Sequence, residues 1–299
     1  MIAGGSLDQA SSGDVTTGGD VLLEAGSDWT MSSGTEITAT GNVSGQALSG
    51  DRPLGWIDAA DVGLIASDNI IDGNAGSLNV SADNLSLVAE GGLIGSDDAS
   101  NGTPDQNVNA IDVQATTLAA NAESGIYLSE ADGLTVTTVS AVAVDIESVV
   151  RVNFNSTTTD VSEDRTISSL EDLSTDSAGP IKVVSLAGSL TIEGGSDGQG
   201  VSAAGNGDVL LKAAQDVTIN AEVVSGSGNI TLDAGNDLAV NASVTTGGTG
   251  TVYLTSGNDT TIDSALTTLS GDLLVDAGSN LTQNSLITST AGDVGLIAG

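Results

Sequence analysis

The chain lacks cysteine and histidine altogether, and it is poor in aromatic residues. Without cysteine there is no disulfide framework, no thiolate nucleophile and no cysteine-ligated zinc site. Without histidine the commonest general base and metal ligand is missing. Aromatic side chains make up only 2% of the sequence, so the bulky groups that usually fill a globular core are scarce.

Basic residues are also scarce, and this scarcity excludes two classes of partner. Five Lys and Arg stand against 40 Asp and Glu, which gives a net charge of −35. Nucleic acid is therefore not expected as a partner, because phosphate binding needs clustered basic side chains. The same repulsion disfavours an anionic membrane surface, and no apolar run reaches the ~18 residues of a membrane span. Residues 1–5 do not have the charged and apolar regions of a signal peptide.

The apolar fraction of 39% is too high for a disordered acidic chain, and the C-terminal third reveals how it is used. A glycine, a small polar residue and an apolar residue recur together every 21 or 22 positions, starting at Gly207, Gly228, Gly250, Gly271 and Gly292. Apolar columns follow at intervals of two residues, the period of a strand with one face inward. The first columns are Val209, Ile230, Val252, Leu273 and Val294, then Leu211, Leu232, Leu254, Val275 and Leu296.

Each repeat holds two further short strands and acidic or amide corners. The second strand begins at Val217 and its equivalents, and the third is marked by Val223 and its equivalents. Asp216 and Asn220 begin two columns of corner residues, of types that tolerate a left-handed backbone. The sequence thus predicts an all-β fold: a parallel β-solenoid of about 21 residues per three-stranded rung, right-handed by the usual crossover rule.

The same signature recurs upstream, with no linker or change of period, so residues 1–299 are interpreted as one β-solenoid segment. Residues 19–26 nearly copy residues 207–214, and residues 61–66 match residues 293–298, which predicts equivalent first strands. Three stretches break the period: residues 45–57, 95–109 and 151–180 are predicted to be irregular loops. Within the last, a short helical turn through Ile167, Leu170 and Leu173 is an alternative to a strand and turn.

The repeated pattern Gly-Asp-Val-x-Leu-x-Ala-Gly-x-Asp-Leu-x-Val-Asn-Ala resembles filamentous-haemagglutinin-type β-helix repeats of very large bacterial surface proteins. Residues 91–95, 126–136 and 151–155 resemble recurring segments of those proteins. The resemblance implies a right-handed β-helix in a secreted or surface-attached adhesin, hence an extracellular or cell-surface location. Its implied partners are further coils of the same parent chain and surface glycans or proteins. Residues 1–4 match residues 296–299, as expected of a segment excised from a longer array.

Candidate sites are weak by comparison, and we predict no catalytic, cofactor-binding or metal-binding residues. The acidic pairs Asp97–Asp98, Glu163–Asp164 and Glu171–Asp172 are interpreted as solvated charge, since adjacent acids are frequent in this composition. Arg165 beside Glu163 and Asp164 is the nearest approach to a catalytic cluster. Corner carboxylates could attract calcium, but residues 194–198 depart from the nonapeptide calcium motif, so only weak, non-specific cation binding is expected.

The aromatic residues Trp29, Trp56, Tyr127 and Tyr253 could contact sugars, although filling a gap or covering a corner is the simpler role for each. The sequence therefore predicts a non-catalytic structural or adhesive shaft. The alternative from another class is a carbohydrate-active β-helix enzyme, either a polysaccharide lyase or a hydrolase. The absence of histidine and the scarcity of basic residues argue against that alternative.

Overall fold

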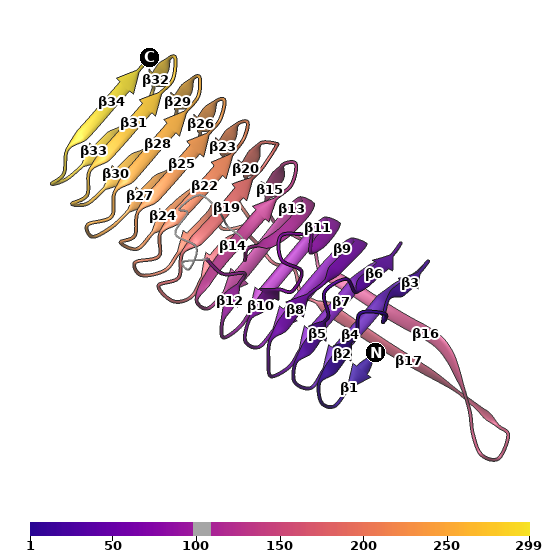
Figure 1. Ribbon diagram of the computed structural model, residues 1–299. Coiled ribbons are helices and arrows are strands. Elements are labelled where there is room, and N and C mark those ends of the chain that lie inside the picture. Colours follow the sequence, from indigo (N-terminus) through magenta and orange to yellow (C-terminus); the bar gives the residue numbers. More distant parts are fainter. Residues whose placement is uncertain (98–108) are drawn as a thin grey trace.

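The computed structural model describes residues 1–97 and 109–299. These residues form 34 strands and no helix, and thirty of the strands join one sheet of parallel neighbours. The strands stack in successive coils along one axis, so the molecule is elongated, with its termini at opposite ends (Figure 1). The prediction of an all-β fold is confirmed, and the stacking is that of a parallel β-solenoid.

The stacked strands form three series. The first, called here the hairpin face, consists of β1 (Ile2–Ala3), β4 (Val21–Ala25), β7 (Val43–Ala47), the C-terminal parts of β9 (Trp56–Ala66), β11 (Val80–Ala89) and β13 (Ile111–Ala122), then β18 (Leu173–Thr175), β21 (Gln199–Ala203), β24 (Glu222–Ser225), β27 (Val244–Thr246), β30 (Leu266–Thr268) and β33 (Ile287–Ser289). The second face consists of β2 (Leu7–Gln9), β5 (Trp29–Met31), β8 (Arg52–Leu54), β10 (Ile70–Asp72), β12 (Leu93–Ile94), β14 (Gly125–Glu130), β19 (Ile181–Ser185), β22 (Val209–Ala213), β25 (Ile230–Ala234), β28 (Val252–Ser256), β31 (Leu273–Ala277) and β34 (Val294–Ala298). The remaining strands of the coil are β3 (Val15–Thr17), β6 (Glu36–Ala39), β15 (Leu134–Val136), β20 (Leu190–Ile192), β23 (Val217–Ile219), β26 (Leu238–Val240), β29 (Thr260–Ile262) and β32 (Leu281–Gln283).

The predicted apolar columns of the C-terminal third are the observed ladders. Val209 pairs with Ile230, which pairs with Val252, and the other columns follow the same register. Leu232 and its neighbours along the column have no exposed surface, whereas Tyr253, in the outward column, is 37% exposed. Like side chains therefore stack into ribs, and one buried core runs through the coils. Gln283 is a polar residue that continues the apolar column of Ile262. It is exposed and donates a hydrogen bond to the Ser285 carbonyl.

The polar corner columns are held by hydrogen bonds between rungs, which corrects our explanation for their residue types. The Asp216 carboxylate accepts the backbone N–H of Asp237, and Asp237 accepts that of Asp259 in the same way. Among the described residues, only three other than glycine have a left-handed backbone, and none belongs to these columns. Asp and Asn recur at the corners because a short side chain reaches the next rung's amide.

The predicted equivalence of the N-terminal and C-terminal first strands is wrong. Residues 19–26 contain β4, which lies on the hairpin face and continues through to β33. Residues 207–214 contain β22, which lies on the second face. Two other predicted matches are wrong in the same way. Residues 61–66 lie in β9 and residues 1–4 contain β1, both on the hairpin face, whereas their predicted equivalents near the C-terminus lie in β34 on the second face. A thin core imposes the same Val-x-Leu-x-Ala alternation on strands of different faces, so sequence similarity does not identify the face.

Residues 45–57 do not form the predicted irregular loop. They provide the end of β7, all of β8 and the start of β9, within the regular coil. Arg52, in the middle of this stretch, is fully buried, and its guanidinium carbon lies 4.3 Å from the centroid of the buried Trp29 ring. A Cβ on Gly45 would lie within 3 Å of both side chains, so glycine makes room for the pair.

The second predicted loop, residues 95–109, lies mostly outside the described residues, which exclude 98–108. At its base Ser96 and Asn109 form an antiparallel bridge, and the Ser96 amide donates to the Asn109 carbonyl at 2.9 Å. This bridge lies between β12 and β13 in the chain.

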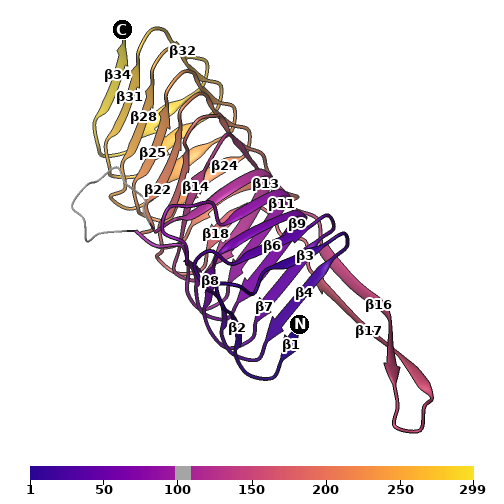
Figure 2. The ribbon, with the colours of Figure 1, turned by 45° about the vertical axis from the view of Figure 1, so that its right-hand side comes forward.

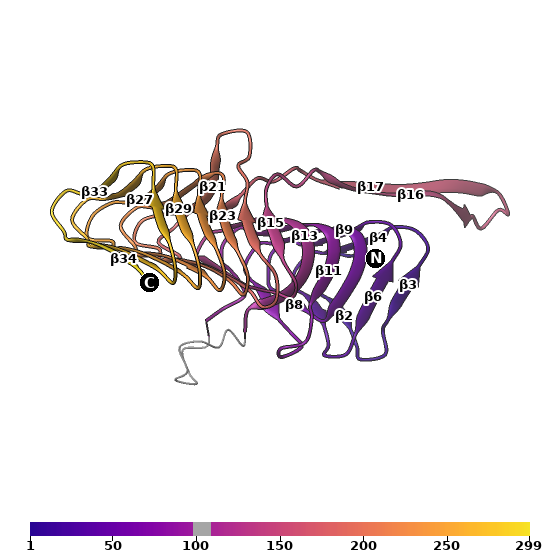
Figure 3. The ribbon, with the colours of Figure 1, turned by 90° about the horizontal axis from the view of Figure 1, so that it is seen from above.

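The third predicted loop, residues 151–180, is mainly an ordered antiparallel hairpin that begins earlier than expected. Its strands are β16 (Val142–Val152) and β17 (Thr158–Ile167), and the chain rejoins the coil at β18. The strand interpretation is confirmed over the helical turn, because the described residues contain no helix. The hairpin runs along the outside of the solenoid and projects beyond its N-terminal end (Figures 2 and 3).

Candidate functional site

An acidic groove lies on the outside of the coil. It encloses about 570 Å³ and is lined by Asp58, Ala59, Ser81, Ala82, Asp83, Gln114, Ala115, Thr116, Asp132, Gly133, Leu134, Thr135, Ser189 and Thr191. The long strands β9, β11 and β13 pass through it side by side, so that Asp58, Ser81 and Gln114 form one row across three rungs. Small alanines in the next row leave the space open.

The groove's functional groups are carboxylates, hydroxyls and one amide. Asp83 and Asp132 are exposed and Asp58 is half-buried, while Gln114 donates to the Asp132 carboxylate at 2.8 Å. Within the described part of the chain, no basic side chain lines the groove. Such a surface attracts cations and can hydrogen-bond to hydroxyl groups, but it repels anions. The lining residues come from five separate segments, and no sequence motif pointed to them.

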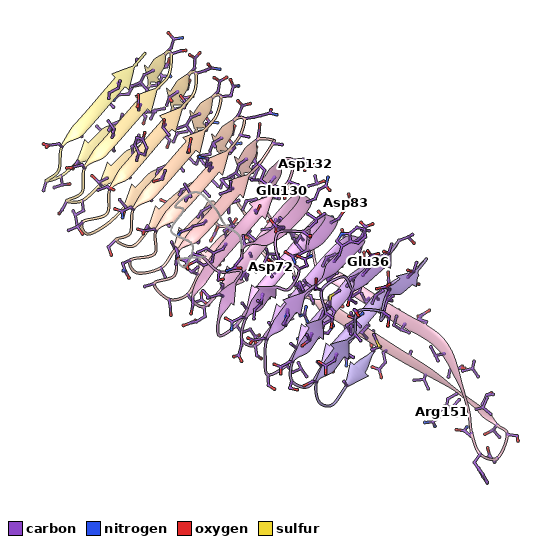
Figure 4. All side chains as sticks on the ribbon, in the orientation of Figure 1. Glu36, Asp72, Asp83, Glu130, Asp132 and Arg151 are labelled. Carbon is purple, nitrogen blue, oxygen red and sulfur yellow. The ribbon has the colours of Figure 1, made fainter. Side chains whose placement is uncertain are left out.

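Glu130, at the end of β14, lies directly behind this groove without exposed surface. Its carboxyl accepts the Ala115 amide at 3.2 Å and the Asp132 amide at 3.3 Å. Burial raises the pKa of Glu130 to about 8, despite these hydrogen bonds to the charged form. Glu130, Asp132 and Asp83 lie along one edge of the coil (Figure 4). Glu130 thus supports the groove wall as a neutral acid near pH 7.

Glu130→Gln is expected to make the stability of the protein less dependent on pH, because the wild type should lose stability as the pH rises. The folded protein holds this proton up to about pH 8, whereas an unfolded Glu releases it near pH 4.5. Folding therefore binds a proton in this window, and the contribution is full below the lower value and lost above the upper one. Melting temperatures from pH 5 to 9 should fall less steeply for the variant, and Glu90→Gln provides an exposed control. Parallel curves for Glu130→Gln and wild type would contradict this assignment.

The three acidic pairs noted in the sequence lie in different surroundings in the fold. Glu163 and Asp164 lie on the hairpin beside Arg165, whose Nε is 2.7 Å from Glu24 Oε2 on β4 and whose Nη1 is 3.6 Å from Glu163 Oε2. Arg165 therefore fastens the hairpin to the coil. Asp97 is exposed, and Asp98 lies outside the described residues.

The third pair, Glu171–Asp172, meets Asp197 in the fold. Ligand oxygens of the three residues lie within 4.8 Å of one another. Asp172 is 7% exposed, accepts the Gly195 amide at 2.9 Å and has a pKa raised by burial to about 6. Glu171 accepts the Ser196 amide at 2.7 Å. Sequence reasoning considered residues 171–172 and 194–198 separately, and only stacking of neighbouring rungs places them together.

This acidic cluster and the corner columns lead to a prediction for cations. Screening of the −35 charge should raise the melting temperature gradually with NaCl, and millimolar calcium and magnesium should act alike. Thermal denaturation in matched CaCl₂ and MgCl₂ series checks this, with Asp197→Asn as the comparison. A saturable, calcium-selective increase that Asp197→Asn removes would instead identify a specific site.

The four aromatic candidates mostly fill space. Trp29 is fully buried and donates from Nε1 to Gln9 Oε1 at 3.1 Å. Tyr127 is 5% exposed, with Lys182 Nζ 5.4 Å from its ring centroid, and burial raises its pKa to about 12. Trp56 is half-buried beside a pocket of about 430 Å³, and Tyr253 is partly exposed in the outward column. Only the last two could therefore meet a ligand.

Comparison with known proteins assigns the chain to no group. No family model matches it, and neither a curated protein nor a solved structure matches it significantly. Among the described residues there is no helix long and apolar enough to cross a membrane.

Proposed function

We propose that the chain is a stretch of shaft: a non-catalytic structural or adhesive module of a large bacterial cell-surface or secreted protein. The observation that carries this proposal is the stacking of equivalent residues from rung to rung around one buried core. Because each rung contacts only its neighbours, length can grow by adding rungs without redesign. The proposal includes a right-handed coil with about 21 residues per three-stranded rung.

The solvated exterior supports a spacer role. The corners of the coil carry columns of Asp and Asn, as in the stacked amides Asn220 and Asn241, whose side chains hydrogen-bond at 2.8 Å. Such polar corners offer few apolar anchors for a tight partner. In this proposal the partners are further coils of the parent chain and surface glycans or proteins, in an extracellular setting.

A second candidate, a carbohydrate-active enzyme, is favoured by one observation: the acidic groove with Asp58, Asp83 and Asp132. Paired carboxylates are the groups that glycoside hydrolysis uses. The repulsion of anions by this groove favours neutral glycans over acidic ones.

One assay series separates the two functions. The 299-residue chain is incubated with neutral and acidic polysaccharides, and reducing ends and unsaturated products are measured alongside binding on a glycan array. The shaft proposal expects no turnover by either the wild type or Asp132→Asn. Turnover that Asp132→Asn abolishes, while Asp293→Asn on a distant rung leaves it intact, would overturn the shaft proposal and support the enzyme.

A further inference from the structure

A recess opens on the coil where one rung turns more tightly than its two neighbours. β8 is joined to β9 by Gly55 alone. The preceding rung has residues 32–35 between β5 and β6, and the following rung has residues 73–79 between β10 and β11. The three rungs are neighbours in the parallel ladder. The two longer loops therefore border the short corner on either side.

This recess is the pocket of about 430 Å³ beside Trp56, the first residue of β9. Its volume lies within the roughly 300–1,000 Å³ that is usual for small-molecule sites. A Cβ on Gly55 would lie 2.6 Å from the Thr35 carbonyl oxygen, so glycine is needed to keep the corner short. The pocket shares no lining residue with the acidic groove, and Glu36 lies nearer the N-terminal rung than Asp83 does (Figure 4).

One wall of the pocket, the 73–79 loop, is held in shape by the side chain of Asn74. Its Nδ2 donates to the carbonyls of Gly55 at 3.2 Å and Leu78 at 2.8 Å. Its Oδ1 accepts a hydrogen bond from Asn79 Nδ2 at 2.9 Å. Ala75 in this loop has φ 53°, a left-handed backbone that costs free energy for a residue with a Cβ. The pocket is thus formed before any ligand arrives, which lowers the cost of binding.

The pocket lining combines an aromatic ring with polar groups that the protein does not use. The side chains of Ser33, Glu36 and Ser77 are exposed and make no hydrogen bond to another described residue. The Trp56 ring is half-buried, and its Nε1–H is buried without an acceptor in the described part of the chain. An unmade hydrogen bond of this kind costs free energy. Because no hydrogen bond holds the indole in its rotamer, a small turn of the ring offers this N–H to a ligand oxygen.

We propose that this pocket binds a neutral pyranose unit of a surface glycan, with the sugar ring against Trp56. A pyranose has a flat C–H face, which stacks on the electron-rich face of an indole, and a rim of hydroxyl groups. The hydroxyls donate to the Glu36 carboxylate and exchange hydrogen bonds with Ser33 and Ser77. The inference rests on the proposed function, because it gives the adhesive role a site and a ligand class.

Charge selects among the ligands that a tryptophan and hydroxyl groups could hold. No basic side chain lines the pocket among the described residues, and the chain carries a net charge of −35. Acidic sugars and nucleotides are therefore repelled. A quaternary ammonium group is usually enclosed by several aromatic rings, and this pocket offers only Trp56 beside Glu36. The combination of one ring with several hydroxyl-binding groups favours a neutral sugar over a cation.

Isothermal titration calorimetry of the 299-residue chain tests the ligand class. Cellobiose, lactose and maltose are the neutral probes, and at least one of them should bind saturably at one site, with a dissociation constant in the millimolar range. Digalacturonate should not bind because it is anionic, and sorbitol should not bind because it has hydroxyl groups but no ring. Choline is the cationic probe. Equal binding of choline or sorbitol, or no saturable binding of the three disaccharides, would overturn the proposal.

Three variants locate the binding. Trp56→Ala should weaken binding by about tenfold or more, since it removes the ring on which the sugar stacks. Ser77→Trp fills the pocket from an exposed loop position, so it should abolish binding without lowering the melting temperature. Tyr253→Ala, which removes an exposed aromatic ring from a regular rung, is the matched control and should bind as the wild type does.

Unchanged binding by Ser77→Trp, or an equal loss in Tyr253→Ala, would show that the sugar binds elsewhere and would overturn the proposal. The melting temperature of Ser77→Trp separates lost binding from lost folding. Absence of binding would remove this pocket as the adhesive site, but it would leave the stacked coil and the absence of turnover in the proposed function unaffected.

Discussion

Leu232→Asp should unfold much of the C-terminal coil. Leu232 has no exposed surface, and it stacks between Leu211 and Leu254 in an apolar rib. A carboxylate there would be buried without a partner, which costs several kcal/mol, and the lost rib would weaken both neighbouring rungs. Urea denaturation followed by circular dichroism should show a large fall in the transition midpoint or loss of the folded baseline.

The matched control is the adjacent residue. Thr231 is half-buried in the outward column, between Leu210 and Tyr253, so Thr231→Asp keeps its new charge in contact with water. Its effect should be within about 1 kcal/mol of wild type. Comparable destabilisation by both substitutions would show that the inward and outward columns have been assigned incorrectly.

Arg52→Met should stabilise the protein, which is unusual for a change in a core. Arg52 is fully buried, its three guanidinium nitrogens have no hydrogen-bond partner among the described residues, and burial lowers its pKa well below the usual value. Contact with the Trp29 ring offsets only part of the desolvation cost. A methionine of similar length should therefore raise the free energy of unfolding by about 1–3 kcal/mol.

Arg151→Met serves as the control, because it removes the same charge from an exposed position. Measured at concentrations where the protein is monomeric, Arg151→Met should change the unfolding midpoint little. If Arg52→Met instead lowers the midpoint by as much as a cavity mutation would, the guanidinium must have a polar partner in solution.

Sequence reasoning succeeded where neighbouring rungs resemble one another. In residues 207–299 the columns of Val209, Leu211 and Val217 predict the observed pairing, because parallel stacking aligns each residue with its own equivalent. It failed upstream, where strands on different faces share one alternation pattern. It also failed at residues 45–57, where Arg52, a residue type expected in an exposed loop, is fully buried in the interior.

The hairpin and the acidic sites were beyond a single-sequence argument for another reason. Residues 142–152 form a strand, but nothing in the local sequence indicates that its partner is β17 or that Gly63 lies against Val142 and Ile167. Likewise, Asp172 and Asp197 belong to different rungs, and the groove combines Asp58 with Asp132. These neighbours are set by the coil's register, which irregular rungs do not reveal.

The most direct test of the shaft is to lengthen it. Residues 208–228, which span one repeat, are duplicated between Gly228 and Asn229 once, twice and four times, a change that keeps the ladder register. Small-angle scattering on monomeric protein should show a length that grows by ~4.8 Å per inserted repeat, with a constant cross-section and no loss of melting temperature. Unfolding on insertion, or growth in cross-section instead of length, would contradict the account.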